Sequence, residues 1–183
     1  MIVIKVGGSL YNLPDLGPRL RGWLATLPAR DILLVPGGGA TADAVRAFDR
    51  LHRLGEERSH WLALQALSVN ARLLAALLPG CRVVADVQEQ AGWRVLDAYR
   101  FALADEEHPG RLPHCWDVTS DSVAARAATV AGARELVLLK SVALPLGVID
   151  WAEAGRRGLV DPFFAEAARG LAVRVINFRE RRP

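Results

Sequence analysis

The chain has 183 residues with a formal net charge of +3, and 51% of its residues are hydrophobic and 23% charged. This composition is typical of a soluble globular protein and excludes a disordered chain, and the length suits one domain, which we expect to span residues 1–183. The basic residues are spread along the chain and form no stripe, which argues against a nucleic-acid-binding protein.

No apolar run reaches the roughly 20 residues that a membrane-spanning helix needs, because Asn70 and Arg72 interrupt the most apolar stretch. The first residues also lack the basic and apolar regions of a secretory signal, so we expect a cytoplasmic protein without a membrane partner. Cys81 and Cys115 form no CxxC pair and are expected to be free thiols.

Apolar runs alternate with helical segments along almost the whole chain. The runs at 2–6, 31–36 and 135–140 predict strands buried on both faces of a sheet, and weaker candidates lie at 81–87, 93–98 and 171–178. Helices are predicted at 14–27, 40–51, 59–78, 120–131 and 161–170. This alternation predicts an α/β fold, a three-layer αβα sandwich with a mainly parallel central sheet.

Two of the predicted helices begin with residues that helix ends prefer. Thr119 is predicted as an N-cap, with Asp121 in the first turn of the same helix. Asp161 is predicted as the N-cap of the last helix, with Pro162 at its first position and Gly170 as its terminator.

Two glycine runs each follow a predicted strand, "KVGGS" at 5–9 and "VPGGGA" at 35–40. Glycines let backbone N–H groups approach a ligand closely, and several such groups near the start of a helix form a cradle for an anion. One run alone fits a plain strand-to-helix turn equally well, but two runs in one small sheet favour an anion site. Neither run has the spacing of a Walker A or a GxGxxG motif.

Charged residues accompany these loops. Only two of the 23 basic residues are lysines, Lys5 on the first predicted strand and Lys140 at the end of the strand at 135–140. Because burying a lysine is costly, a lysine at the carboxyl end of a strand is expected to point into a site. Asp117 and Asp121 lie at a helix start, where they either cap the helix or orient the lysines and help to hold Mg²⁺ beside phosphate groups.

Together, "KVGGS", "VPGGG", "TSDS" and "LVLLKSV" resemble, in the same order, the motifs of the amino acid kinase superfamily, which includes acetylglutamate, aspartate, glutamate 5-, carbamate and uridylate kinases. The resemblance covers most of the chain. It implies a kinase that transfers the γ-phosphoryl group of ATP to a carboxylate, carbamate or phosphate acceptor with the help of Mg²⁺. It also implies a homodimer or a higher homo-oligomer.

The resemblance further implies roles for individual residues. Lys5 would contact the transferred phosphoryl group, Asp121 would hold the catalytic lysine in place, and Lys140 is the candidate second lysine. Phosphate and nucleotide contacts would come from Gly7, Gly8, Ser9, Gly37, Gly38, Gly39, Thr119 and Ser141. Such an enzyme mainly positions two anions and spreads positive charge over the transition state.

Within the superfamily, "GGGATADAVRAFDR", "SHWLALQALSVNARLL" and "CWDVTSDSVAA" are most similar to a branch of small kinases linked to methanofuran and tetrahydromethanopterin in one-carbon metabolism. This similarity implies an aminomethylfuran phosphate as acceptor and a diphosphate as product. Candidates for the acceptor pocket are Asp43, Arg46, His60, Trp61, Gln65 and Asp117, each with a structural alternative as a helix-start acid, a solvated arginine or a packing residue. The alternatives are a kinase of an amino-acid carboxylate or carbamate, and a non-catalytic protein that binds a nucleotide or anion.

The chain departs from the family after the strand at 135–140. Family members often have an acid where Ala143 stands and a second catalytic lysine further on, but no lysine follows Lys140. Lys140 itself, or Arg156 and Arg157, would have to replace that lysine. The region that holds the nucleotide in the family is short here.

Two remaining features favour structural roles. His108, His114 and Cys115 lack a fourth zinc ligand, so they favour a polar loop at 105–115, whose length makes it a candidate mobile loop at the site, and no metal site is predicted. The helix at 59–78 is apolar on two faces, and its second face is a candidate subunit interface.

Overall fold

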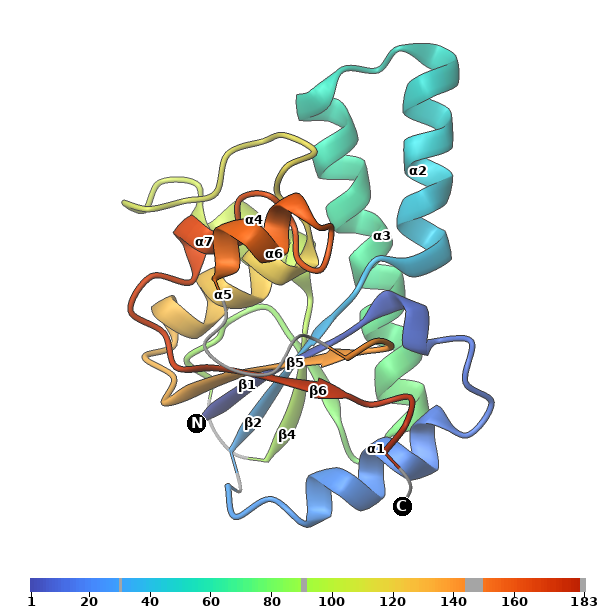
Figure 1. The fold of residues 1–183 in the computed structure, drawn as a ribbon, viewed down its shortest axis with the longest axis vertical. Coiled ribbons are helices and arrows are strands. Elements are labelled where there is room, and N and C mark those ends of the chain that lie inside the picture. Colours follow the sequence, from blue (N-terminus) through green and yellow to red (C-terminus); the bar gives the residue numbers. More distant parts are fainter. Residues whose placement is uncertain (30, 90–91, 144–149, 182–183) are drawn as a thin grey trace.

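The computed structural model describes residues 1–29, 31–89, 92–143 and 150–181, which form an α/β sandwich (Figure 1). A six-stranded sheet runs through the middle in the order β3-β4-β2-β1-β5-β6. Its strands are β1 (Ile2–Val6), β2 (Ile32–Pro36), β3 (Arg82–Val84), β4 (Trp93–Leu96), β5 (Glu135–Lys140) and β6 (Val173–Asn177). Every pair of neighbouring strands is parallel, so the predicted fold class is confirmed.

Helices cover both faces of this sheet (Figure 1). The described helices are the 3-10 helix η1 (Gly8–Leu10) and the α-helices α1 (Leu16–Ala25), α2 (Gly39–His52), α3 (Glu56–Leu77), α4 (Ala98–Asp105), α5 (Ser120–Val130), α6 (Trp151–Arg156) and α7 (Phe164–Ala167). Helix α2 packs against α3 and η1 and projects away from the sheet (Figure 1). One apolar cluster joins α1 to the strands, and a second joins them to α4, α5 and α7. The long helix α3 contributes to both, with Leu64 and Leu67 in one cluster and Ala71 and Leu74 in the other.

Two helices differ from what the sequence patterns predict. The sequence patterns predict no helix at α4 or α6. Helix α4 follows β4 directly, and its first residue, Ala98, continues the apolar run of that strand. A capping signal precedes each of them: the Asp97 carboxylate accepts from Arg100 N at 3.3 Å, and Asp150 accepts from Ala152 N and Glu153 N at 2.9 and 3.1 Å. These aspartates are the local signal from which both helices can be found.

The last predicted helix is only partly correct. Helix α7 spans only the four residues Phe164–Ala167, and its N-cap is Phe163. The predicted N-cap, Asp161, therefore lies outside the helix. The carboxylate of Asp161 instead accepts hydrogen bonds from the start of α5, including one from Thr119 N at 3.0 Å. The prediction of Asp161 as the cap of its own helix is therefore wrong, and Asp161 serves a different helix.

The order of the strands brings the two lysines together. Strand β1 lies between β2 and β5, and its Lys5 is in register with Leu138 of β5. Since parallel strands all end at the same edge of a sheet, Lys5 and Lys140 lie on neighbouring central strands at one edge.

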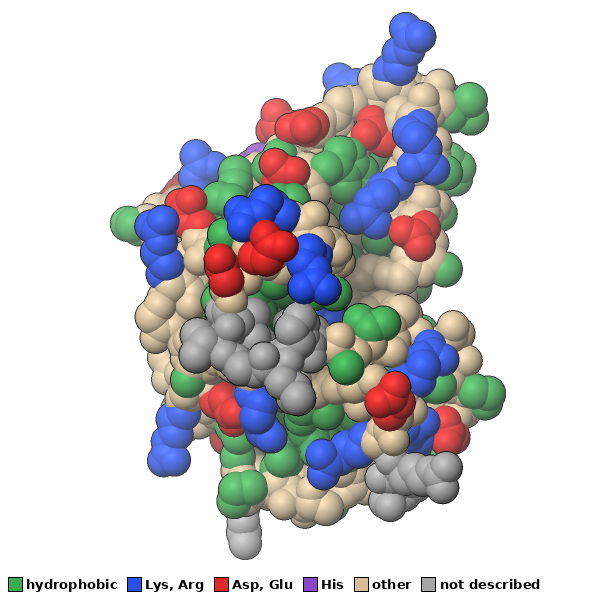
Figure 2. All heavy atoms as spheres, in the orientation of Figure 1, with side chains coloured by type: hydrophobic (Ala, Val, Ile, Leu, Met, Phe, Trp, Pro, Cys, Tyr) green, Lys and Arg blue, Asp and Glu red, His purple; other side chains and the backbone are tan. Residues whose placement is uncertain are grey.

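No helix in the described part of the chain is long and apolar enough to cross a membrane. Lysine and arginine side chains are scattered over the face drawn in Figure 2 and do not gather into one basic patch.

Asn70 connects helix α3 to the second glycine loop. Its side chain is buried, and its Nδ2 donates to the carbonyl oxygens of Gly37 and Gly38, both at 2.7 Å, and lies 2.8 Å from Thr41 Oγ1. A glycine loop has no side chains with which to fix itself, so this amide and the hydroxyl of Thr41, which donates to Gly38 O at 2.6 Å, help to hold it. The polar residue that interrupts the apolar run of α3 is therefore a structural element of the loop.

We predict that Asn70→Ala lowers the free energy of unfolding by about 2 kcal/mol, because the buried carbonyl of Gly37 loses its donor and the carbonyl of Gly38 keeps only the hydroxyl of Thr41. Urea denaturation followed by circular dichroism measures the change. Arg58→Ala, at an exposed position of the same helix, is the control and should change the value by less than about 0.5 kcal/mol. Equal effects of the two substitutions would contradict the role of the Asn70 amide.

Candidate active site

A buried carboxylate joins the two lysines at the carboxyl edge of the sheet. Asp121 Oδ1 lies 2.8 Å from Lys5 Nζ, and Asp121 Oδ2 lies 2.6 Å from Lys140 Nζ. Lys5 and Asp121 are only 5% and 4% exposed. The first turn of α5 thus supplies one anion, which lies between cations from β1 and β5. The prediction that Asp121 orients the lysines agrees with this arrangement.

Lys5, Asp121 and Lys140 form a charged triad, and its charges affect the pKa values of Asp121 and Lys140. Burial opposes the charge on Asp121, but the two ammonium groups outweigh it and hold the pKa of Asp121 below its ordinary value. Burial and the positive charge of Lys5 lower the pKa of Lys140 to about 8, although Asp121 acts in the opposite direction. Two cations share one anion, so the triad carries excess positive charge and favours a further anion beside it.

The two glycine loops touch each other through their backbones. A Cβ atom on Gly8 would lie 2.2 Å from Gly39 N, and one on Gly37 would lie 2.3 Å from Gly8 N. Since no real Cβ atom comes this close to a backbone atom, both positions require glycine. Gly39 also has φ +53°, a conformation that favours glycine.

The backbone amides of the loops divide into two groups. Gly7 N donates to Leu139 O at 2.9 Å and Gly37 N donates to Val6 O at 2.8 Å, so these two amides fix the loops to the sheet. Their expected role in holding phosphate oxygens stays a prediction. Gly39 lies in the first turn of α2, where backbone N–H groups have no acceptor within the helix and are available to an anion.

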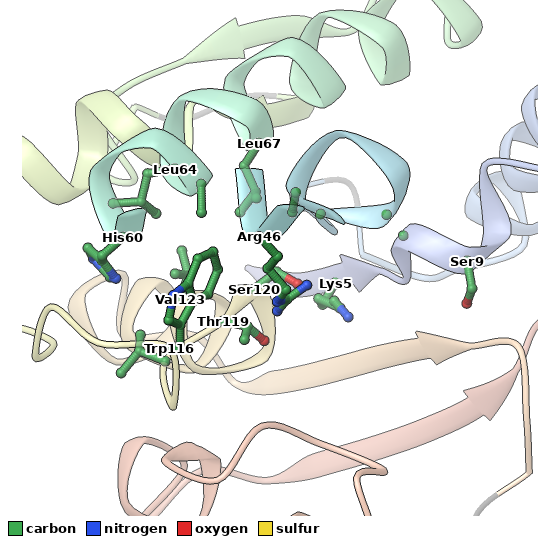
Figure 3. Close-up of a pocket in the computed structure, with 16 residues that line it drawn as sticks. Lys5, Ser9, Arg46, His60, Leu64, Leu67, Trp116, Thr119, Ser120 and Val123 are labelled. Carbon is green, nitrogen blue, oxygen red and sulfur yellow. The ribbon is translucent and has the colours of Figure 1, made fainter. Parts of the chain in front are cut away.

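A cavity of about 180 Å³ opens beside the triad and the loops (Figure 3). Of the predicted site residues, those that line it are Lys5, Gly8, Ser9, Gly38, Gly39, Arg46, His60 and Thr119. One end is polar and positively charged, and the other is apolar, with Leu64 and Leu67 of α3 and Val123 of α5. The cavity suits a ligand with an anionic group and an apolar body.

Trp116 is a cavity residue that the sequence patterns do not predict. The guanidinium carbon of Arg46 lies 4.9 Å from the centre of its indole ring, and its Nε1 donates to Asp49 Oδ2 at 2.7 Å. The guanidinium of Arg46 also lies 3.1 Å from Asp43 Oδ1. Trp116 and Asp43 thus hold Arg46 at the cavity wall. Trp116 follows three residues that favour a loop, and only its position next to Asp117 marks it in the sequence.

His60 is an uncharged polar residue of the cavity. Burial and the nearby His114 lower the pKa of His60 to about 4, so its imidazole is neutral at pH 7. Its ring stacks on that of His114 with centroids 5.1 Å apart. The neutral ring offers a hydrogen-bonding group and a flat surface, but no charge, to a ligand.

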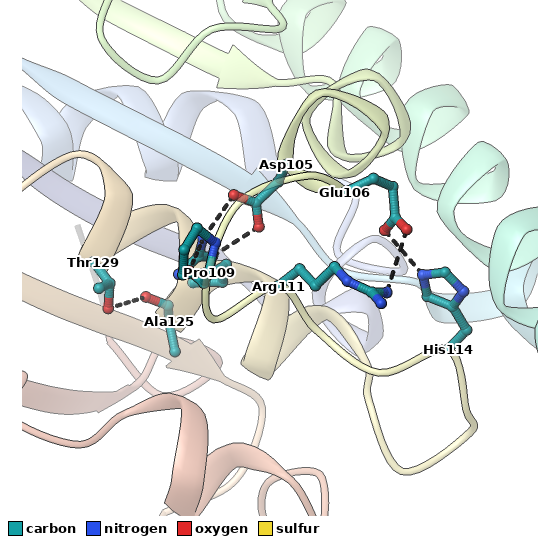
Figure 4. A network of polar contacts seen from close by, with 8 residues as sticks. Asp105, Glu106, Pro109, Arg111, His114, Ala125 and Thr129 are labelled. Carbon is teal, nitrogen blue, oxygen red and sulfur yellow. Dashed lines mark hydrogen bonds and ion pairs between the residues drawn. The ribbon is translucent and has the colours of Figure 1, made fainter.

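The loop at 105–115 is attached to the helices around it (Figure 4). Arg126 makes two 2.7 Å hydrogen bonds to the carboxylate of Asp105 and a third, at 3.0 Å, to Pro109 O, while His114 Nε2 lies 2.9 Å from Glu106 Oε1. Its mobility stays a prediction. In the described part of the chain no cluster of His, Cys, Asp or Glu could hold a metal ion, and Cys81 and Cys115 are free.

Four predicted pocket residues lie elsewhere. Asp43 contacts the cavity only through Arg46, and Gln65 is exposed on α3. Trp61 packs edge-on against Tyr99 and His114. Asp117 is exposed, and its backbone carbonyl accepts from Phe163 N at 3.2 Å.

The remaining predicted residues lie around the triad. Ser9 Oγ donates to Ser141 Oγ at 2.8 Å, which links the first glycine loop to the end of β5. Arg156 is paired with Glu153 at 2.7 Å and Arg157 is exposed, so Lys140 is the cation that the structure brings to Asp121. Residues 144–149, which follow Ala143 and include part of the departure from the family motif, lie outside the described residues.

Comparison with known proteins identifies the family. Residues 1–144 match the sequence pattern of the family described as "Amino acid kinase family". The chain belongs to the amino acid kinase family. The matched residues contain both glycine loops, Asp121 and Lys140, so the whole triad lies within the part that defines the family.

Two curated relatives of the chain are kinases. The chain is 25% identical over 148 residues to [5-(aminomethyl)furan-3-yl]methyl phosphate kinase of Methanocaldococcus jannaschii, covering 78% of this chain and 66% of the relative. It is 26% identical over 145 residues to uridylate kinase of Thermoplasma acidophilum, covering 77% and 60%. The chain therefore spans about two thirds or less of the length of these relatives.

Solved structures of the amino acid kinase family share the fold. Uridylate kinase from Archaeoglobus fulgidus superposes with a TM-score of 0.67 at 17% identity, covering 96% of this chain and 89% of the other. Aspartate kinase from Synechocystis gives a TM-score of 0.62 at 14% identity, covering 96% and 38%. These likenesses concern the fold alone.

We predict that the side chain of Lys140 titrates with a pKa of about 8, far below that of an ordinary lysine, because it is buried next to Lys5. NMR of ¹³C-labelled lysine measures this directly, since the chain has only two lysines and Lys140→Arg assigns their signals. In Asp121→Asn the pKa of Lys140 should fall further, because the carboxylate that favours the charged form is lost. Asp15→Asn, at an exposed position, should leave it unchanged.

Proposed function

We propose that the protein is an ATP-dependent phosphotransferase that transfers the γ-phosphoryl group to a small phosphate monoester. An aminomethylfuran phosphate is the proposed acceptor, which the reaction would convert to a diphosphate in methanofuran-type cofactor biosynthesis. The observation that carries the proposal is the buried Lys5–Asp121–Lys140 triad beside two glycine loops that admit no side chain.

The triad has the properties that phosphoryl transfer requires. Negative charge spreads over the oxygens of the phosphoryl group in the transition state, and fixed cations and N–H groups stabilise it without having to reorganise. Asp121 fixes the positions of both ammonium groups. Lys5 lines the cavity and would contact the transferred group, and Lys140 would contact phosphate oxygens from the neighbouring strand.

The residues fit a polyphosphate better than a metal ion held by the protein. The carboxylate of Asp121 is already bound by both lysines, and the described residues contain no group of three or more His, Cys, Asp or Glu that could hold a metal ion. A Mg²⁺ ion could therefore be held mainly by nucleotide phosphates and water, as Mg²⁺ often is. No step of the proposed mechanism depends on a side chain that binds the metal.

The acceptor end of the cavity supports a phosphate monoester that carries a flat ring. Arg46 offers a charged, multidentate partner for a phosphate, and Trp116 holds it in place. The neutral ring of His60 and the side chains of Leu64 and Val123 suit an apolar ring. Both curated relatives are named for substrates of this kind, a furan-methyl phosphate and uridylate.

We predict that ADP forms only when ATP and a phosphate monoester are both present. The test measures ADP release with aminomethylfuran phosphate, UMP, an amino-acid carboxylate and carbamate as acceptors. Lys5→Ala should lower kcat about 10²- to 10³-fold, the usual cost of removing one transition-state stabilising group. ATP binding without ADP formation with any acceptor would favour the non-catalytic alternative, and turnover of the carboxylate or carbamate would favour the other kinase alternative.

The same assay tests the acceptor pocket. Arg46→Ala should raise KM for the phosphate monoester about 10-fold or more, because the cation at the cavity wall is lost. Arg50→Ala, an exposed arginine on the same helix, is the matched control and should leave KM unchanged. An equal KM in wild type and Arg46→Ala would place the acceptor phosphate elsewhere.

Self-association is also part of the proposal. Six large apolar side chains are exposed on three consecutive helices, and they are Phe48, Leu51, Leu62, Val69, Leu73 and Leu103. On α3, Leu62, Val69 and Leu73 lie at the spacing of a helix–helix seam, which would fit the same stripe on a second copy.

We predict that the double substitution Val69→Glu and Leu73→Glu lowers the molar mass measured by light scattering after gel filtration to that of a monomer, because the seam then carries like charges. Val142→Glu, at an exposed apolar position outside these helices, is the control and should leave the mass unchanged. A wild-type protein that is monomeric at all concentrations would contradict the proposal.

A further inference from the structure

Asp161 is a buried carboxylate outside the cavity. It lies between α6 and α7 and is only 6% exposed, among the apolar residues Val160 and Phe164. A carboxylate at such a position needs several hydrogen-bond donors, because burial removes its water. The residues that supply these donors show which part of the fold Asp161 holds.

All of its side-chain partners belong to the start of α5. Asp161 Oδ2 accepts from Thr119 N at 3.0 Å, Thr119 Oγ1 at 2.9 Å and Ser122 N at 2.9 Å, and Asp161 Oδ1 accepts from Ser122 Oγ. Thr119 is the N-cap residue of α5, but its own side chain makes no capping bond and donates to Asp161. The capping carboxylate therefore comes from 39 to 42 residues further along the chain.

The first turn of α5, which Asp161 holds, also contains Asp121, the carboxylate of the triad. The two backbone N–H groups that it binds, on Thr119 and Ser122, lie on either side of Asp121 in the sequence. Thr119 and Ser120 line the cavity, and Asp121 binds both lysines. A shift of this turn would move the carboxylate on which the positions of Lys5 and Lys140 depend.

A second contact fixes the same two segments to each other. Phe163 N donates to Asp117 O at 3.2 Å, two residues before Thr119. The segment at 160–163 is thus bound to the start of α5 through both a carboxylate and the backbone.

The charge of Asp161 also reaches the lysines. The charged groups near the Lys140 ammonium are Lys5 of β1, Asp121 of α5 and Asp161, and the last two favour its protonated form. Burial and the charge of Asp121 raise the pKa of Asp161, while the donors of Thr119 and Ser122 oppose that rise. Asp161 therefore offsets only part of the positive charge of the triad.

We propose that Asp161 is a positioning residue of the phosphoryl-transfer site, which holds the first turn of α5 so that Asp121 keeps Lys5 and Lys140 in place. This inference rests on the proposed function for its effect on turnover, but not for its effect on the lysines. Asp161 touches neither the cavity nor the reacting groups, and it acts through Asp121.

The test compares Asp161→Asn with Asp150→Asn in the full chain. The side chain of Asp150 likewise accepts hydrogen bonds at the start of a helix, but Asp150 is exposed and is the N-cap residue of α6 itself. In Asp161→Asn the pKa of Lys140, measured by NMR of labelled lysine, should fall below about 8, and in Asp150→Asn it should stay there. A merely structural cap would lower the unfolding temperature in both variants without moving the pKa.

Turnover provides the second readout. Asp161→Asn should lower kcat about 10- to 100-fold, the effect expected of a small displacement of a catalytic group, while KM for the acceptor changes less than about 3-fold. The basic limb of its pH–rate profile should move to lower pH, because Lys140 loses its proton earlier. Asp161→Glu, which keeps the charge, should restore the position of that limb even where kcat stays low.

The outcomes separate the two proposals. A folded Asp161→Asn with an unchanged Lys140 pKa and with kcat within about 2-fold of wild type would overturn the role of Asp161. If Asp161→Asn does not fold, Ser122→Ala replaces it, because this substitution removes one of the four donors to Asp161. It should also lower the pKa of Lys140, but by a smaller amount. An unchanged Lys140 pKa in Ser122→Ala would overturn the role of Asp161 as well. If no acceptor supports ADP formation in the wild type, the proposed function fails, and the lysine titrations still decide the role of Asp161.

Discussion

The site depends on one constraint, a carboxylate buried between two ammonium groups. A buried charge is tolerated only where it is paired, and Asp121 pairs with both lysines of the chain. This pairing requires β1 and β5 to be neighbours and α5 to begin at the same edge of the sheet. Three features hold the two ammonium groups and the carboxylate a few ångströms apart. They are the strand order, the position of α5 and the hydrogen bonds from the start of α5 to Asp161.

Much of this arrangement could be predicted from the sequence, because it follows from local patterns. Apolar runs identified the strands, and the carboxyl ends of parallel strands must meet, so the positions of Lys5, Lys140 and the two glycine runs implied one site. Family motifs supplied the role of Asp121. The contacts between the glycine loops add a reason that the sequence does not contain: Gly8 and Gly37 leave no space for a single carbon atom.

The rest could not be predicted because it depends on residues far apart in the sequence. Asp161 has the local signature of a helix cap, yet its partners lie 39 to 42 residues away. Asn70 interrupts an apolar helix and contacts a loop 32 to 33 residues earlier. Trp116 lies in a loop whose path no periodicity describes. In each case a side chain with an ordinary local explanation acquires its function from the fold.

The presence of both lysines in one site has a consequence for the chemical reactivity of the protein. An amine-directed reagent acylates neutral primary amines, and Lys5 and Lys140 are the only two lysine side chains of the chain. With its lowered pKa, Lys140 has a far larger neutral fraction near pH 8 than an ordinary lysine. Any lysine modified by such labelling or immobilisation would therefore lie in the candidate active site, whereas the same procedure on most proteins modifies the outer surface.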